Sequence, residues 1–406
     1  MVKLTQNKTR LILVGAGHTH ALFLQSLVQA QSVQNPILNI EILLISPLSL
    51  APYSGMITGW LAGQYDFNET VIDFDALCKH VGAKWVKAEM LGLDPDAQTV
   101  SLSTGESFFY DWLSINIGST LRPPEDLAPS VLALRPLWTL RQRYDTYLES
   151  WALEKNKKPL TITTVGAGAA GVESLLCILQ RLRQMRPDRA VQARLISRSE
   201  DILPGFSATA RRLARQALNN AQVTIKCDAD WQNTIAVNRD IVSRDGLSAN
   251  VLSSNQSSQE LVIWATGAQA HDWQLDPTLH LTLRVSADGF IQVDETLRSV
   301  SHPNIFATGD CAELPSRVPK AGVYAVRMAS TLIANLRMAM AYQSHLTQQV
   351  QTFKRFETKP YALALLNTGD GHAIASWRSF GFSGKSVWLL KDRIDRRFIN
   401  KFKSFS

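Results

Sequence analysis

Cysteine is scarce in this chain, and the few cysteines lie far apart. The 406 residues include four of them: Cys78, Cys177, Cys227 and Cys311. None forms a CxxC or CxxxxC pair, and none clusters with histidine at the spacing of a metal site. The sequence therefore excludes a disulfide scaffold and a zinc site, and it favours a reducing, cytoplasmic compartment. We expect all four to be packing residues, with a redox role for Cys311 as the alternative.

Long hydrophobic runs and a strong charge are missing as well. No apolar stretch reaches 18 residues, so no transmembrane helix is predicted, and the N-terminus lacks the pattern of a secretory signal. The chain has 42 Lys and Arg against 35 Asp and Glu, which leaves a net charge of only +7. Without a basic stripe, this surplus does not indicate a nucleic-acid partner. With 45% hydrophobic residues, the chain can bury the cores of two or three domains.

What the sequence does contain is a strand–turn–helix–strand pattern that occurs twice. One copy covers residues 11–20 and leads to a strand at 40–45, and the other covers 160–173 and leads to 191–196. Each is a βαβ unit of a parallel sheet. The glycines of such a turn let the backbone approach a pyrophosphate, and the following helix offers free N–H groups to that anion. Two such units, each in the right context, predict two dinucleotide sites.

The two glycine turns differ at their third glycine. The second turn is complete, with Gly166, Gly168 and Gly171. The first has Gly15 and Gly17, but His20 stands at the third position. The strand and helix there must accommodate a bulkier contact than glycine would require. We still predict a nucleotide at the first turn.

Further motifs give the chain a resemblance to a known family. They are GAGAAGVE at 166–173, ATGA at 265–268 and ATGDCA at 307–312, followed by a helical pattern from 320 to about 342. Together they resemble the flavoproteins with two dinucleotide-binding domains, the pyridine nucleotide-disulfide oxidoreductase superfamily, over residues 10 to about 340. Within it the chain is similar to the type II NADH dehydrogenases.

A narrower resemblance rests on three shorter motifs. GHTH at 17–20, PYSGM at 52–56 and KDRIDRRF at 391–398 resemble the FAD oxidoreductases associated with selenophosphate synthetase. It implies an alternative function, that of a slow-turnover flavoprotein partner or redox sensor associated with the synthetase.

The resemblance implies an α/β fold with two Rossmann-like domains of three layers (ββα). An FAD domain at 1–125 and 269–342 would be interrupted by an NAD(P)H domain at 126–268. A small C-terminal α+β region, residues 343–406, would follow as a possible interface.

The resemblance also implies where FAD would bind. Asp310 would hydrogen-bond the ribityl chain, and the helix start near residue 320 would face the flavin, where reduction leaves negative charge. Ser46 stands where many members carry the acid that binds the adenosine ribose. The expected FAD contacts are Gly15, Gly17, His18, Thr19, Ser46, Pro52, Gly55, Gly118, Gly309, Asp310, Gly322 and Val323.

For NAD(P)H, the expected contacts are Gly166, Gly168, Gly171, Arg198 and Gly267. The equivalent place at the end of the strand at 191–196 reads Ile196-Ser197-Arg198-Ser199, with no acid. An acid would repel a 2′-phosphate, whereas a guanidinium matches it. The sequence thus favours NADPH, with NADH and a vestigial pocket as alternatives.

Two residues are candidates for a catalytic role, Glu173 as part of a proton relay and Lys320 as a contact to flavin or substrate. A structural role is the alternative for each. We expect His18 and His20 to be neutral hydrogen-bonding residues, because a helix N-terminus disfavours an imidazolium. A direct catalytic role is the alternative for both.

The missing cysteine pairs bear on the electron acceptor. Disulfide, coenzyme A disulfide and sulfide chemistry require reactive thiols. We therefore predict an FAD-dependent NAD(P)H oxidoreductase with a quinone-like acceptor. A basic tail with a four-residue apolar spacing could contact a membrane surface, the protein itself or a second copy in a homodimer; its apolar members are Leu390, Ile394, Phe398 and Phe402.

Overall fold

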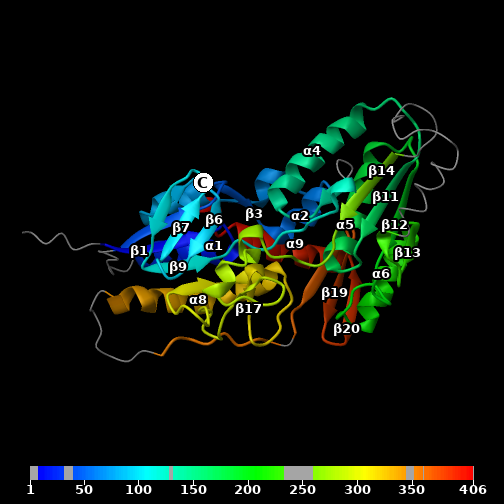
Figure 1. Ribbon diagram of the computed structural model, residues 1–406. Coiled ribbons are helices and arrows are strands. Elements are labelled where there is room, and N and C mark those ends of the chain that lie inside the picture. The colour runs from blue at the N-terminus through cyan, green and yellow to red at the C-terminus, as the bar shows by residue number, and fades with distance from the viewer. Residues whose placement is uncertain are drawn as a thin grey trace, which may run out of the picture.

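Two parallel β-sheets of five strands form the framework of the protein. The computed structural model describes residues 8–31, 40–127, 131–232, 259–343, 352–359 and 361–405. Each sheet has helices packed beside it, and the two sheets lie toward opposite ends of the molecule (Figure 1). The predicted α/β class with two Rossmann-like units is confirmed.

The first sheet has the strand order β16-β9-β1-β2-β5, and its strands are all parallel. Leu11 to Val14 of β1 are almost fully buried, as expected for a strand covered on both faces. A separate three-stranded antiparallel sheet shares this core and adds a third layer. The elements of this lobe are β1 (Thr9–Val14), α1 (His18–Gln31), β2 (Ile40–Ile45), α3 (Phe74–Val81), β5 (Lys84–Val86), β6 (Met90–Asp94), β7 (Thr99–Leu102), β8 (Ser107–Phe109), β9 (Trp112–Ile115), β15 (Ile291–Gln292), β16 (Ile305–Ala307), β17 (Ala312–Glu313) and α8 (Gly322–Gln343).

The second sheet has the order β10-β14-β11-β12-β13 and is again parallel. Its elements are β10 (Val131–Ala133), α4 (Leu137–Leu153), β11 (Leu160–Val165), α5 (Ala169–Met185), β12 (Val191–Ile196), α6 (Ala208–Asn220), β13 (Val223–Lys226) and β14 (Gln259–Trp264). All of them fall between β9 and β16 of the first sheet. One unit is therefore inserted into the other, whereas the exact boundaries at 125, 268 and 342 stay predictions.

The two glycine turns have the same backbone geometry. The N–H of Gly15 donates to the carbonyl of Ile45, and the N–H of Gly166 donates to that of Ile196, each at 2.8 Å. Each first glycine thus extends its strand's ladder by one bond to the neighbouring strand before the chain turns into a helix. The predicted repeat is confirmed at this level of detail.

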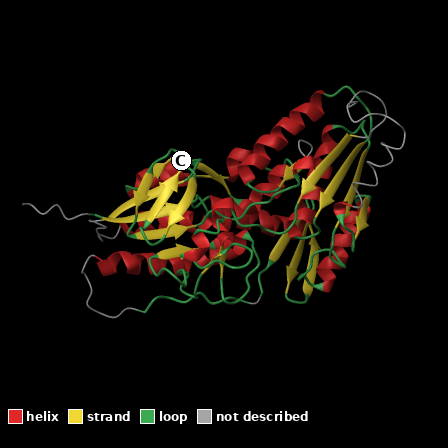
Figure 2. Cartoon of the chain, viewed as in Figure 1, coloured by secondary structure: helices red, strands yellow, loops and turns green. Residues whose placement is uncertain are grey.

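The C-terminal part consists of a three-stranded antiparallel sheet and a helix, β18 (Ala364–Asn367), β19 (Ala373–Trp377), β20 (Phe380–Gly384) and α9 (Lys385–Ile399). Figure 2 shows these strands beside the second sheet. The sheet packs on α5 and α6 of the second unit, and α9 reaches back to the first. No helix in the described ranges is long and apolar enough to cross a membrane.

Shorter elements complete the chain. They are the strands β3 (Leu50–Pro52) and β4 (Val71–Asp73), the helix α2 (Ser54–Leu61) and 3-10 turns at Phe67–Thr70, Glu125–Leu127, Asp272–Leu275, Leu279–Leu281, Gly309–Cys311 and Lys403–Phe405.

Candidate nucleotide sites at the ends of the sheets

The first glycine turn packs against the residue that follows β9. Gly15 has φ +95°, and a Cβ there would lie 2.5 Å from the carbonyl oxygen of Asn116. A Cβ on Gly17 would lie 2.0 Å from the side-chain oxygen Oδ1 of Asn116. Both positions therefore require glycine, because any side chain would collide with Asn116.

His20 ties the turn to the sheet. Its Nδ1 donates to the carbonyl of Gly15 at 2.7 Å, and its Nε2 lies 2.8 Å from the hydroxyl of Ser114 on β9. Burial lowers the pKa of His20 to about 4. The expected neutral, hydrogen-bonding role of His20 is confirmed. Its two hydrogen bonds hold the turn at the position where the third glycine of the motif would let the helix pack close to the strand.

His18 marks the place where α1, the segment at 52–56 and α8 meet. Its Nε2 accepts from the N–H of Ser54 at 3.3 Å, and its ring makes an edge contact with Tyr53. Burial lowers the pKa of His18 to about 4, so it is neutral as expected. A Cβ on Gly322, at the start of α8, would lie 3.7 Å from His18 Cε1. The expected FAD contacts Pro52, Gly55, Gly322 and Val323 all belong to these converging segments.

The sequence interpretation missed Asn116. Its Oδ1 accepts from the N–H of Thr19 at 3.1 Å, and its Nδ2 donates to the carbonyl of Thr308 at 2.8 Å. The Thr19 hydroxyl donates to Ala325 of α8. Thr19 thus has protein partners for both of its donors, and its contact with a nucleotide stays a prediction. Aligning the repeats would have revealed Asn116, because Ala265 holds the same position in the second one.

Asp310 lies in the 3-10 turn after β16. Its carboxylate lies 2.6 Å from the guanidinium of Arg135 and accepts from the hydroxyl of Ser119 at 3.3 Å. Gly118 and Gly309 both adopt positive φ, +74° and +72°, in the loops that bring these groups together. Arg135 had no assigned role in the sequence interpretation.

Ser46 lies at the end of β2, where the ribose acid of the family would stand. It is buried, and its hydroxyl donates to the carbonyl of Leu48 at 2.9 Å within its own loop. A ribose contact by Ser46 stays a prediction.

The second glycine turn has an open side. A Cβ on Gly166 would lie 2.3 Å from the Ala265 carbonyl oxygen, and one on Gly171 would lie 1.9 Å from that of Gly166. A Cβ on Gly168 would meet nothing within 4 Å, and no side chain caps α5 there. The free N–H groups of α5 thus face open space, which fits a pyrophosphate. Gly267, at the neighbouring strand end, is exposed.

Arginines surround the end of β12. Arg198 is exposed, directly after the buried Ser197. Two acids follow Arg198 along the chain: Glu200 is exposed, and Asp201 is paired with Arg211 at 3.0 Å and also with Arg215. The four residues Ile196 to Ser199, where the family's acid would stand, include no carboxylate.

Glu173 lies near the start of α5 and is partly buried. Its Oε1 accepts from the hydroxyl of Thr58 at 2.7 Å and from the N–H of Asn367 at 2.9 Å. Burial raises the pKa of Glu173, and the charge of nearby Lys391 opposes this shift. Glu173 therefore joins α2, α5 and β18, which span the first unit, the second unit and the C-terminal sheet.

Lys391 and Asp395 of α9 form a buried ion pair beside the segment at 52–56. The ammonium of Lys391 donates to the Gly55 carbonyl at 2.6 Å and to Asp395 at 2.8 Å. Tyr53 hydrogen-bonds Asp395, and its ring stacks on Phe398 with centroids 4.3 Å apart. The sequence indicated only a basic amphipathic tail and missed this contact.

Lys320 precedes α8, and its ammonium contacts residues at and around the short strands β15 and β17. Its ammonium donates to the Ala312 carbonyl and to Glu313 at 2.8 Å, and it lies 3.9 Å from the centre of the Phe290 ring. These contacts give Lys320 a structural role. Its contact with flavin or substrate stays a prediction.

Comparisons with known proteins decide the family. Residues 5–329 match the pyridine nucleotide-disulphide oxidoreductase family. The chain belongs to this family. Its proteins bind FAD and use NAD(P)H as the electron donor, in agreement with the cofactors expected from the sequence.

Relatives within the family support a likeness to NADH dehydrogenases. An alternative NAD(P)H-ubiquinone oxidoreductase of Arabidopsis thaliana is 27% identical over 252 residues, which are 58% of this chain and 45% of that protein. The chain spans about half the length of the curated relatives that it matches in this way.

Two solved structures show the same fold. NDH2 of Plasmodium falciparum, in complex with NADH, superposes with a TM-score of 0.71 at 15% identity and covers 97% of each chain. An engineered water-forming NADPH oxidase bound to NADPH gives 0.62 at 19% identity, covering 90% of this chain and 75% of that one.

The cysteines have no redox partners among the described residues. Cys78, Cys177 and Cys311 are buried and Cys227 is partly buried, all of them as free thiols. Burial raises the pKa of the Cys311 thiol to about 11. The expectation that these are packing residues is confirmed for the three buried ones.

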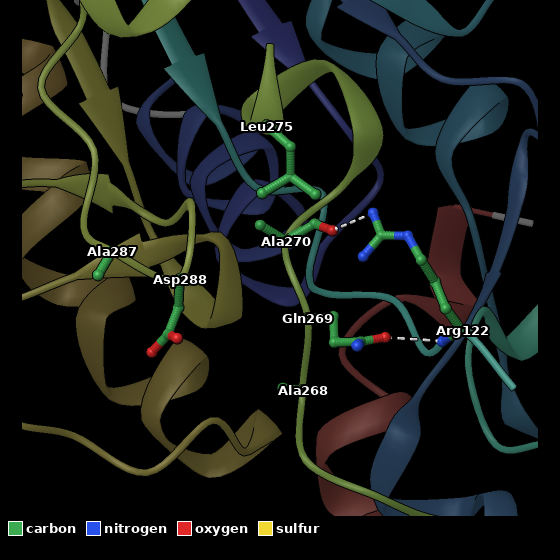
Figure 3. Close-up of a pocket in the computed structure, with 7 residues that line it drawn as sticks. All are labelled: Arg122, Ala268, Gln269, Ala270, Leu275, Ala287 and Asp288. Atoms are coloured by element: carbon green, nitrogen blue, oxygen red, sulfur yellow. Dashed lines mark hydrogen bonds between the residues drawn. The ribbon is translucent and has the colours of Figure 1, made fainter. Parts of the chain in front are cut away.

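A small pocket lies beside the two chain segments that connect the sheets. It encloses about 220 Å³ and is lined by Arg122, Ala268, Gln269, Ala270, Leu275, Ala287 and Asp288. Figure 3 shows the Arg122 guanidinium reaching the Ala270 carbonyl, at 2.6 Å. Arg122 also pairs with the exposed Asp272. Arg122 thus joins the two connecting segments. It is not among the residues predicted to contact FAD or NAD(P)H.

The apolar stripe of the tail is divided. Phe398 and Phe402 are buried against the first unit, whereas Leu390 and Ile394 are exposed. The exposed end continues onto the C-terminal sheet, which adds Trp377, Phe380 and Phe382. Packing on the protein itself therefore accounts for two of the four apolar residues, Phe398 and Phe402.

Proposed function

We propose that this chain is an FAD-dependent NAD(P)H oxidoreductase that passes electrons to a quinone-like acceptor. The observation that carries the proposal is the pair of glycine turns, each at the carboxyl end of a buried parallel strand and at the start of a helix. The name of the Arabidopsis relative supports both the donor and a quinone acceptor.

The residues of the first turn fit FAD. Gly15 and Gly17 leave the backbone bare, and α1 and α8 begin beside one another without an acid in their first turns. When bound, FAD supplies the hydride-accepting chemistry. The chain's own contribution is to hold and orient the cofactors and to exclude water.

The donor we propose is NADPH. The end of β12 carries Arg198 between two serines, and no acid stands at positions 196–199. The engineered NADPH oxidase is described by substitutions that remove an aspartate and introduce two arginines and a serine. The same chemistry, a guanidinium with no acid at the position directly after the strand, suits a 2′-phosphate here.

Glu173 and Lys320 are the proposed catalytic residues. Burial raises the pKa of Glu173, which makes its carboxyl a better proton acceptor than that of an exposed glutamate. Lys320 lies before the start of α8, where its charge would favour an anionic ligand. Both keep their structural contacts as the alternative explanation.

The exposed apolar end of α9 is the proposed membrane contact. Leu389, Leu390 and Ile394 are exposed there, together with Arg393 and Arg397. A helix that presents apolar and basic side chains can lie on an anionic lipid surface. Such a contact would suit a lipid-dissolved quinone. A homodimer through this surface is the other prediction for it.

The spectrum of the purified protein tests the function. We expect an absorption band near 450 nm, a general property of oxidised flavin, which anaerobic NADPH bleaches.

Arg198→Glu should impair turnover with NADPH far more than with NADH, because the new carboxylate repels only the 2′-phosphate. A colourless protein that stays so with excess FAD would refute the proposal, and equal effects on both donors would refute the NADPH preference. Rapid quinone reduction would also exclude the selenophosphate synthetase alternative, which no observation described here favours.

A further inference from the structure

Arg135 brings a positive charge from the second unit into the first. It lies two residues after β10, the edge strand of the second sheet. Asp310 and Ser119, its partners, follow β16 and β9 of the first sheet. No family motif in the sequence includes Arg135, so only the structure shows that it enters the FAD side of the molecule.

The contacts of Arg135 converge on one carboxylate. Its Nη1 lies 2.6 Å from Asp310 Oδ2 and also contacts the hydroxyl of Ser119, which itself donates to that same oxygen. Nη2 reaches the carbonyl of Lys320 at 3.5 Å, just before α8. The guanidinium and the hydroxyl therefore fix the carboxylate of Asp310 from two sides. A planar guanidinium makes such contacts with a defined geometry that a lysine ammonium does not.

We propose that Arg135 is a positioning residue for the FAD site, through which the second unit orients Asp310 toward the ribityl hydroxyls of the cofactor. The inference rests on the proposed function, in which Asp310 binds FAD. Oδ2 is the oxygen fixed by Arg135 and Ser119, so the carboxylate cannot rotate freely. Retention of FAD then depends on the second sheet, which supplies no strand to the FAD sheet.

The ion pair between Arg135 and Asp310 is more buried than an ordinary surface ion pair. The Asp310 side chain is 11% exposed and that of Arg135 is 29% exposed. The other arginine that joins the connecting segments, Arg122, pairs with an aspartate that is 93% exposed. Arg122 also holds the connections together, through Gln269 and Ala270, but it does not contact Asp310. It is therefore a matched control for a purely structural effect.

The test is a titration of apo-protein with FAD, followed by fluorescence quenching. We expect Arg135→Met to raise the dissociation constant about tenfold or more, equivalent to about 1.4 kcal/mol. Arg122→Met should change it less than twofold. Arg135→Lys should fall between Arg135→Met and wild type, because it keeps the charge but loses the planar fork.

A double-mutant cycle identifies the partner. If Arg135 acts through Asp310, Arg135→Met combined with Asp310→Asn should weaken FAD binding no more than the more damaging single substitution. Additive effects would overturn the inference, as would an affinity of Arg135→Met within twofold of wild type. If Arg135→Met does not fold, Arg135→Lys is measured instead. An FAD affinity of Arg135→Lys within twofold of wild type would then overturn the inference. Wild-type protein that binds no FAD would instead refute the proposed function.

Discussion

Replacing Lys391 with methionine should weaken the attachment of α9 to the rest of the protein. The Lys391 and Asp395 side chains are only 11% and 7% exposed. Methionine retains the length of the side chain but leaves the Asp395 carboxylate without its cation and the Gly55 carbonyl without its donor. Removing one partner of a buried ion pair costs about 3–5 kcal/mol. We expect a loss in this range at pH 8, measured from the first transition of a urea titration followed by tryptophan fluorescence.

The pH dependence of this loss follows from the charge left behind. Burial already raises the pKa of Asp395, and the charge of Lys391 opposes this shift. Without Lys391 the folded-state pKa of Asp395 rises further above its unfolded value, so protonation favours the folded state. The loss caused by Lys391→Met should therefore be largest at pH 8 and smaller at pH 5.

Two further variants make the result decisive. Arg393→Met removes a positive charge from the exposed face of the same helix and should cost less than about 1 kcal/mol. Combining Lys391→Met with Asp395→Asn should recover part of the stability, because the carboxylate that was paired with Lys391 is then replaced by a neutral amide. A loss for Lys391→Met no larger than that of Arg393→Met would refute the reasoning.

Three other predictions concern the turns and the tail. Burial lowers the pKa of His20 from 6.5 to about 4, so the unfolded state binds the extra proton in this window and stability falls as the pH falls through it. The change of unfolding free energy with pH from this residue is up to about 1.4 kcal/mol per pH unit. It should decrease in His20→Gln when urea midpoints are compared at pH 7, 6 and 5, and an unchanged pH dependence would contradict the lowered pKa of His20. Gly171→Val should abolish NADPH binding in calorimetry while FAD remains bound, because the new side chain collides with the turn; unchanged NADPH affinity would contradict this role. Leu390→Glu should reduce co-sedimentation with anionic vesicles at least as much as Arg397→Gln, and a Leu390→Glu protein that sediments like wild type would exclude this surface from membrane contact.

The sequence predicted features that depend on neighbours along the chain. A glycine turn is a local feature, because the strand before it and the helix after it fix the conformation that its residues must adopt. The first turn could therefore be predicted despite His20, and the helix expected to open near residue 320 begins at Gly322. The neutral state of His20 was also predictable, because a buried position at a helix start disfavours an added charge.

Residues that act across long separations could not be found in this way. Asn116 joins residues 19 and 308, and Arg135 reaches Asp310 from another sheet. Nothing in the immediate sequence of Arg135 differs from that of an ordinary loop residue after a strand. Their importance depends on which strand ends meet, and the fold decides this. Only Asn116 left a local sign, a polar residue where the second repeat has alanine.

The tail shows the limit of periodicity. The four-residue spacing of its apolar side chains predicted one helical stripe, and α9 with the following turn provides it. Spacing cannot tell which part of a stripe meets the protein. Phe398 is buried because it stacks on Tyr53, some 340 positions earlier in the chain, whereas Ile394, one turn before it, faces outward.

The contact between α9 and the segment at 52–56 has a consequence for biosynthesis. Tyr53 and Gly55 leave the ribosome early, but their partners Lys391, Asp395 and Phe398 are among the last residues to be translated. This part of the surface of the nascent first unit therefore stays uncovered until synthesis is almost complete. Domains otherwise tend to fold in the order in which they emerge. A stop codon shortly before residue 391 would thus leave the segment at 52–56 of the first unit without its partners, rather than merely shorten the chain's end.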